Sequence, residues 1–150
     1  KNLLVEVVDA IYVDQTVEVG ETYFYAITAV DRGAKESPMS SVASDSPLNL
    51  PSLVSPIEGA LIETPVVFRW NSVPKATGYR VVVTTSPTSG EISEIELTPD
   101  TTVAFVGRLL SKNQRMELES GAIYYWKVIA STQNTGVENT VSSITNFKVR

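Results

Sequence analysis

The sequence of 150 residues contains neither cysteine nor histidine. Without a histidine base or a thiolate nucleophile, Ser-His-Asp and Cys-His catalytic triads are excluded. Zinc sites that use nitrogen or sulfur ligands are excluded for the same reason. The lack of cysteine does not identify a compartment, because it is the presence of disulfides that marks an oxidising one. The missing residues therefore rule out several large enzyme classes, but they do not indicate where the protein is located.

Positive charge is also scarce. Lysine and arginine number 12 against 17 acidic residues, giving a net charge of -5, and no two basic residues are adjacent. Nucleic acids and anionic membranes attract clustered positive charge, so we expect neither as a partner. No apolar run approaches the roughly 20 residues of a membrane span, so we expect no membrane insertion. Glu6 interrupts the apolar N-terminal run, so we expect no signal peptide and a chain cut from something longer.

A tyrosine-centred pattern occurs twice, 101 positions apart. An apolar residue is followed by glycine, then tyrosine, then apolar residues at every second position: Val17, Gly20, Tyr23, Tyr25, Ile27, Ala29 and Leu118, Gly121, Tyr124, Trp126, Val128, Ala130. Alternation of this kind predicts a strand with one face turned inward. The period is far longer than that of solenoid repeats, so the sequence indicates two copies of one domain.

The chain divides at two prolines, Pro47 and Pro51, which stiffen the backbone and cannot donate to a sheet. We expect residues 47–51 to be a semi-rigid linker between a block 1–46 and a block 52–150. In the first block the predicted strands are Leu3–Val8, Ile11–Val13, Thr22–Val30 and Ser40–Ala43. In the second they are Leu53–Val54, Val66–Trp70, Tyr79–Thr85, Ile92–Leu97, Thr102–Val106, Ile123–Ser131 and Ile144–Val149, with one or two helical turns within Gly107–Glu117.

The second block resembles a fibronectin type III domain, as found in bacterial surface and secreted proteins. The resemblance lies in Trp70, in Tyr79 with Ala76 three residues before it, and in the corner that ends at Tyr124. It covers Pro51 to Arg150 and implies an all-β, antiparallel, immunoglobulin-like sandwich in which the corner tyrosine bonds back to nearby backbone. The expected structural core is Trp70, Tyr79, Leu118, Tyr124, Trp126, Val128 and Phe147, with Tyr23, Tyr25 and Ile27 in the first copy.

The first block matches only the later strands of this family, so three of its seven strands would precede Lys1. A half sandwich leaves Tyr23, Tyr25 and Ile27 without a facing sheet, and each exposed large side chain forfeits about 1.5–3 kcal/mol. Our hypothesis is that another chain or a strand-exchanged copy completes this block, or that its bare face packs on a neighbour.

Candidate sites are few. Phe24, Tyr125 and Val30 face outward and suit an inter-domain contact, a ligand contact or scattered surface positions. Asp31-Arg32-Gly33 reverses the order of an integrin-binding tripeptide and reads as a turn. Glu91, Glu94 and Glu96 form carboxylate pairs, and Ser111 precedes Lys112, but a solvated edge strand explains the acidic residues better than catalysis. We expect no catalytic, cofactor or metal site.

The sequence thus predicts a non-catalytic spacer or protein-interaction module of a larger secreted or cell-surface bacterial protein. Its expected partners are other domains of the same polypeptide, with a protein or a polysaccharide as ligand. The alternative is an accessory carbohydrate-binding module attached to a polysaccharide-degrading enzyme. That function needs exposed aromatic rings in a line, for which Tyr125 with Phe24 or Phe105 is the available set.

Overall fold

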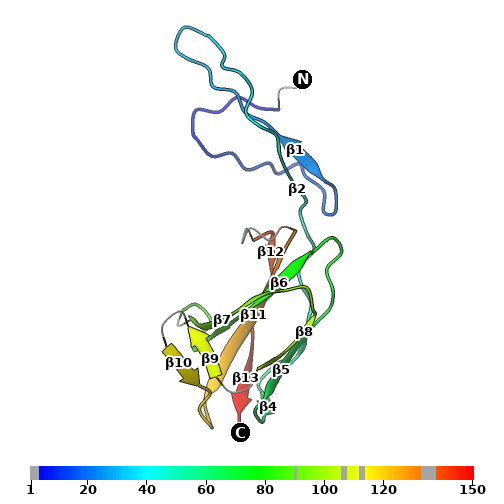
Figure 1. The fold of residues 1–150 in the computed structure, drawn as a ribbon, viewed down its shortest axis with the longest axis vertical. Coiled ribbons are helices and arrows are strands. Elements are labelled where there is room, and N and C mark those ends of the chain that lie inside the picture. Colours follow the sequence, from blue (N-terminus) through cyan, green and yellow to red (C-terminus); the bar gives the residue numbers. More distant parts are fainter. Residues whose placement is uncertain (1–3, 90, 106–107, 112–113, 133–137) are drawn as a thin grey trace.

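The chain folds into two blocks of β-structure that lie end to end along its longest axis (Figure 1). The computed structural model describes residues 4–89, 91–105, 108–111, 114–132 and 138–150, with the backbone alone over 91–97, 108–111 and 114–117. All regular structure in the described part is strand. The segment 47–51, expected to be the linker, follows β2 (Ala43–Asp45) and precedes β3 (Leu53–Ser55).

The C-terminal block contains two facing sheets. In the first, β5 (Val66–Trp70) lies between β3 (Leu53–Ser55) and β8 (Thr102–Phe105), and both neighbours are antiparallel to it. The second has the order β4 (Ala60–Ile62), β13 (Thr145–Val149), β11 (Ile123–Ser131), β6 (Gly78–Thr84) and β7 (Glu91–Thr98), with β12 (Thr140–Val141) also paired to β11. Only the β13–β4 pair in this sheet is parallel.

Aromatic rings fill the space between these sheets. Phe68 from β5 lies 4.8 Å from the ring of Trp126 and 5.7 Å from that of Phe147, both of which belong to the opposite sheet. Trp70 packs edge-on against Tyr79 at 5.5 Å. These inward positions alternate with more exposed ones along β5. The all-β, immunoglobulin-like sandwich predicted from the sequence is confirmed.

The N-terminal block has little regular structure. A short hairpin pairs β1 (Tyr23–Tyr25) with β2 (Ala43–Asp45), and an isolated bridge joins Val30 to Glu36 farther along. The strands expected at Leu3–Val8 and Ile11–Val13 do not form over residues 4–13, and β1 is shorter than the expected Thr22–Val30. A strand needs a neighbour to satisfy its backbone groups, and from residue 4 to residue 46 the structure shows one hairpin and one isolated bridge.

The helical turns expected within Gly107–Glu117 are wrong. The described residues there form a hairpin of β9 (Arg108–Ser111) and β10 (Gln114–Glu117), in which Leu109 pairs with Met116. A short apolar run does not distinguish helix from strand by its spacing, so pairing with a neighbour decided the structure. The short strands β4 and β12 were not predicted, because two or three residues carry too little alternation.

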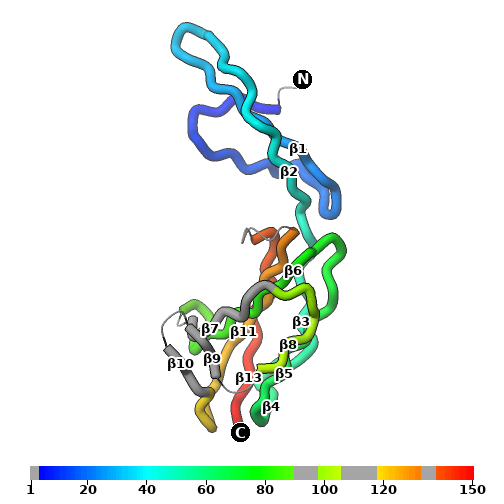
Figure 2. The backbone as a smooth tube through the Cα atoms, in the orientation of Figure 1, coloured from blue at the N-terminus to red at the C-terminus, as the bar shows by residue number. Residues whose placement is uncertain are grey.

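The linker is not a free tether. Figure 2 traces the backbone from β2 into β3 through the connection. Leu48, in the middle of this connection, is 7% exposed and belongs to the core of the C-terminal block, and Pro51 is buried as well. The end of the linker is therefore packed as part of the sandwich that follows it.

Candidate functional site

Two corners with the same geometry mark the entry to β1 and to β11. The hydroxyl of Tyr124 accepts a hydrogen bond from the Glu119 N–H at 3.0 Å, and that of Tyr23 accepts one from the Glu18 N–H at 2.8 Å. Each corner turns on a glycine with positive φ, +83° at Gly121 and +86° at Gly20. Both bonds span five residues, so the repeated pattern produces the same local structure twice.

The strands beyond the corners also share their hydrogen bonds. Ser142 Oγ accepts from the Val128 N–H at 2.9 Å, and Ser40 Oγ accepts from the Ile27 N–H at 3.1 Å. Each serine then donates to the carbonyl of the next residue. The hairpin registers agree as well: Tyr124 lies opposite Phe147, and Tyr23 lies opposite Asp45. The two segments therefore correspond residue by residue.

The two copies differ in what covers their inward side. In the C-terminal block Trp70, Tyr79, Tyr124, Trp126, Val128 and Phe147 are buried, and Leu118 is partly buried against them. In the N-terminal block Tyr23 is half-buried, Tyr25 is 38% exposed and Ile27 is 76% exposed. The expected core positions of Tyr25 and Ile27 are thus wrong, because the described residues include no sheet equivalent to β3-β5-β8 that faces β1.

We call this side of the N-terminal block, with Tyr23, Tyr25 and Ile27, the uncovered face. Of the 20 large apolar side chains exposed in the described part of the chain, 14 precede residue 47. None of the described residues before Ser46 is buried. Monomeric proteins rarely leave so much apolar surface in one region without a partner. The uncovered face is therefore the strongest candidate for an interaction site.

Polar contacts organise part of the uncovered face. The rings of Tyr23 and Tyr25 stack with centroids 6.4 Å apart, and the Tyr25 hydroxyl donates to Asp14 Oδ2 at 2.9 Å. The hydroxyl and N–H of Thr16, with that tyrosine, lower the pKa of Asp14. Desolvation and the bond to Asp14 raise the pKa of Tyr25. Near neutral pH Asp14 is therefore charged and Tyr25 is protonated, so the two form a hydrogen bond and no proton is transferred between them.

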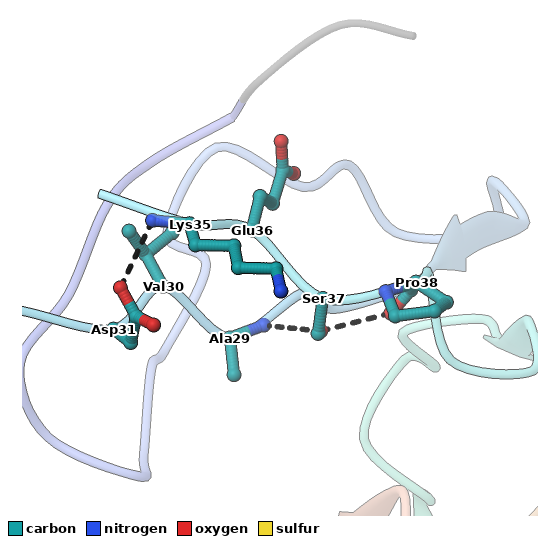
Figure 3. Close-up of a pocket in the computed structure, with 7 residues that line it drawn as sticks. All are labelled: Ala29, Val30, Asp31, Lys35, Glu36, Ser37 and Pro38. Atoms are coloured by element: carbon teal, nitrogen blue, oxygen red, sulfur yellow. Dashed lines mark hydrogen bonds between the residues drawn. The ribbon is translucent and has the colours of Figure 1, made fainter. Parts of the chain in front are cut away.

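The turn after β1 forms a small hollow between Ala29–Asp31 and Lys35–Pro38 (Figure 3). Asp31 Oδ1 accepts from the N–H groups of Gly33 at 2.8 Å and Lys35 at 3.0 Å, while the Ala29 N–H donates to Ser37 Oγ at 2.9 Å. The Asp31 carboxylate therefore stabilises the turn itself, as expected for Asp31-Arg32-Gly33.

The outward aromatic residues do not form a line. Phe24 is 71% exposed on the N-terminal block, opposite Ser44. Tyr125 is half-buried on β11 of the other block. Phe105 is 7% exposed and lies in the core, so it offers no ring to a sugar. Phe24, Tyr125 and Phe105 therefore do not make the line of exposed rings that a carbohydrate platform needs.

Other candidate chemistry has little support in the structure. Among the described residues no group of three or more acidic side chains is placed to hold a metal ion. The same part of the chain has no helix suited to crossing a membrane. The side chains of Glu91, Glu94, Glu96 and Ser111, considered above as catalytic candidates, lie outside the described residues, as does Lys112.

Sequence reasoning missed a polar cluster where the blocks meet. Thr132 Oγ1 donates to Asp45 Oδ1, Asn139 Nδ2 donates to Ser46 O at 3.3 Å, and Lys75 Nζ donates to Gly20 O. These contacts join residues 55 to 93 positions apart in the chain. No local sequence pattern predicts such pairs, because polar residues of these types are common at exposed positions.

Comparison with solved structures gives fibronectin type III-like folds. A crystal structure of an Fn3-like protein from Clostridium thermocellum is 21% identical, with a TM-score of 0.49, over 70% of this chain and 96% of that one. A human fibronectin type III domain solved in solution is 17% identical, with a TM-score of 0.42, over 69% and 72%. No protein-family model and no curated protein matches the chain.

Proposed function

We propose that this chain is a non-catalytic spacer and protein-interaction module of a larger secreted or cell-surface protein. In this proposal the N-terminal block is the later part of a second fibronectin type III-like domain, in tandem with the complete one. The observation that carries it is the uncovered face, where β1 repeats the geometry of β11 but lacks the sheet that buries Trp126 and Val128. An exposed apolar face of this kind marks an interaction site, and the partner in this proposal is another polypeptide.

The proposal gives the two blocks different roles. The closed sandwich already buries its core aromatic residues, and its described residues leave no comparable apolar face to a partner. The uncovered face associates with another polypeptide, since covering Ile27 and Tyr25 removes apolar surface from water. The extended arrangement of the blocks sets the distance between their neighbours (Figure 1). Neither binding a partner nor holding flanking domains apart requires a catalytic residue.

Association through the uncovered face can be tested with one substitution. Ile27→Asp places a charge in that face, and Ile123→Asp is the matched control at a 52% exposed position of β11. Light scattering across a concentration series should show self-association in the parent chain and in I123D but not in I27D. A parent chain that stays monomeric at high concentration, with an ordered N-terminal block by NMR, would contradict the proposed interaction role.

A further inference from the structure

The polar cluster between the blocks has a definite composition, and we call it the junction. It consists of Asp45, Ser46 and the Gly20 carbonyl on one side, and Lys75, Thr132 and Asn139 on the other. We propose that the junction locks the two blocks at one angle, so that the module sets a direction as well as a distance. This inference rests on the proposed spacer function and adds orientation to it.

The first part of the lock is a pair of residues between β11 and β12. Asn139 Oδ1 accepts from the Thr132 N–H at 2.9 Å, which orients the amide so that its Nδ2 donates to Ser46 O. The Thr132 hydroxyl donates to Asp45 Oδ1. Both groups are therefore positioned by their own block before they reach across. Donors arranged in advance lose less conformational entropy when they bond.

The acceptor side is equally well prepared. Asp45 Oδ1 also accepts from the Ser46 N–H at 2.7 Å, and Ser46, 7% exposed, shares a hydroxyl hydrogen bond of 2.9 Å with Thr22. Partial burial acts to raise the pKa of Asp45, but the hydrogen bonds from Thr132, Ser46 and Asn139 outweigh it and lower that pKa. The carboxylate thus stays charged, and hydrogen bonds to a charged acceptor are stronger than neutral ones.

The second part of the lock is Lys75, on a strained turn. The Ala76 N–H donates to Val73 O at 3.1 Å, with Pro74 second and Lys75 third in the turn at φ +67°. Glycine is the usual residue at this position, because a side chain disfavours positive φ. The Val73 N–H bonds the buried Tyr79 hydroxyl at 2.7 Å, which anchors the turn. Lys75 occupies a position that favours glycine while its amine contacts Gly20 O, which indicates a role for that contact.

The backbone between the two parts has little freedom left. The Gly20 N–H donates to Pro47 O at 2.9 Å, which ties the corner of the N-terminal block to the start of the linker. Leu48, one residue later, is buried in the C-terminal core. The linker is therefore held by a hydrogen bond to the N-terminal block and by Leu48 in the C-terminal core. With so little freedom left in the linker, the few junction bonds suffice to fix the angle between the two blocks.

Distances between spin labels can test this lock in the intact chain. Because the chain has no cysteine, Met39→Cys and Leu61→Cys introduce a single labelled pair, at positions 52% and 55% exposed on the two blocks. Pulsed electron spectroscopy should give one narrow distance distribution. Thr132→Val with Lys75→Met removes the Thr132–Asp45 and Lys75–Gly20 bonds of the lock, while Thr102→Val with Lys148→Met is the matched control on β8 and β13.

We expect the junction variant to broaden the distribution about twofold or more, as for blocks on a short semi-rigid linker, and the control to leave it unchanged. A broad distribution in the parent, or an unchanged one in the junction variant, would overturn the lock. Urea unfolding of each variant shows whether the sandwich itself is intact. All labelled chains also carry Ile27→Asp, which removes association through the uncovered face, so failure here and failure of the proposed interaction role are distinguishable.

Discussion

At the scale of single residues, the two corner tyrosines form the same bond in different surroundings. Tyr124 is 3% exposed, whereas Tyr23 is only half-buried, although both hydroxyls accept from a backbone N–H five residues earlier. An N–H that loses its acceptor costs free energy when it is buried, whereas an exposed N–H can bond to water instead. The hydrogen bond to Tyr124 should therefore contribute more to stability than the one to Tyr23.

Tyr124→Phe should lower the free energy of unfolding of the C-terminal block by about 1 kcal/mol, because the Glu119 N–H loses its acceptor. Tyr23→Phe should destabilise its own corner in the N-terminal block much less. Urea titrations followed by the fluorescence of the buried tryptophans would measure the C-terminal block, and hydrogen exchange at the Glu119 and Glu18 amides would compare the two corners. Equal losses in the two variants would show that burial does not set the strength of this bond.

Replacing Lys75 with glycine should raise the stability of the C-terminal block and loosen the orientation of the two blocks. Lys75→Gly relieves the positive φ and should stabilise the C-terminal block by about 1 kcal/mol, since a strained left-handed residue costs roughly that much. It should also broaden the distance between the blocks, because the bond to Gly20 O is lost. Thermal unfolding and label distances measure the two effects. Destabilisation by glycine would mean that the turn is not strained.

At the scale of elements, the hairpin of β11 depends on a serine where the strands separate. β11 pairs with β13 up to Trp126 and with β12 from Ile129, and between these stretches the buried Val128 N–H bonds Ser142 Oγ. The equivalent bond from Ile27 to Ser40 is exposed. The side chain thus replaces a missing backbone partner at this gap.

Ser142→Ala should cost about 1–3 kcal/mol, because it leaves a buried N–H without an acceptor. Ser40→Ala is the matched control and should cost little. Hydrogen exchange at the Val128 and Ile27 amides would report the change locally. Unaltered protection of Val128 in S142A would contradict the role assigned to the hydroxyl.

Elements also show how far the sequence predicts this structure. The alternation of Val66, Phe68 and Trp70 predicted β5 with its observed ends, and that of Tyr124, Trp126 and Val128 did so for β11. The same alternation at Tyr25 and Ile27 identified the inward side but did not reveal that nothing covers it. The alternation of apolar residues predicts which face of a strand is apolar, whereas the presence of a covering sheet depends on residues elsewhere in the chain.

At the scale of the whole molecule, the junction connects orientation to pH. The pKa of Asp45 is lowered in the folded state, so its bonds contribute fully above the ordinary aspartate value of about 3.9 and are lost as pH falls through the lower, folded value. The label distance should therefore stay narrow near neutral pH and broaden in acid. Asp45→Asn should remove this pH dependence, and an identical acid response in that variant would assign it to other groups.

The junction lay beyond sequence analysis because its partners are distant along the chain. Nothing near Thr132 or Asn139 distinguishes them from solvated turn residues, and Asp45 stands where the other copy has the core residue Phe147. That exchange of an aromatic ring for a carboxylate becomes meaningful only once Thr132 is seen beside it. Long-range polar contacts follow from the assembled fold rather than from periodicity.

The polypeptide enters the C-terminal sandwich at the end nearest the linker and leaves β13 at the far end (Figure 1). Tension along the molecule would therefore pass through the full height of that sandwich instead of bypassing it. Under such tension the hydrogen bonds between the paired strands of the sandwich would carry the load before the block unfolds.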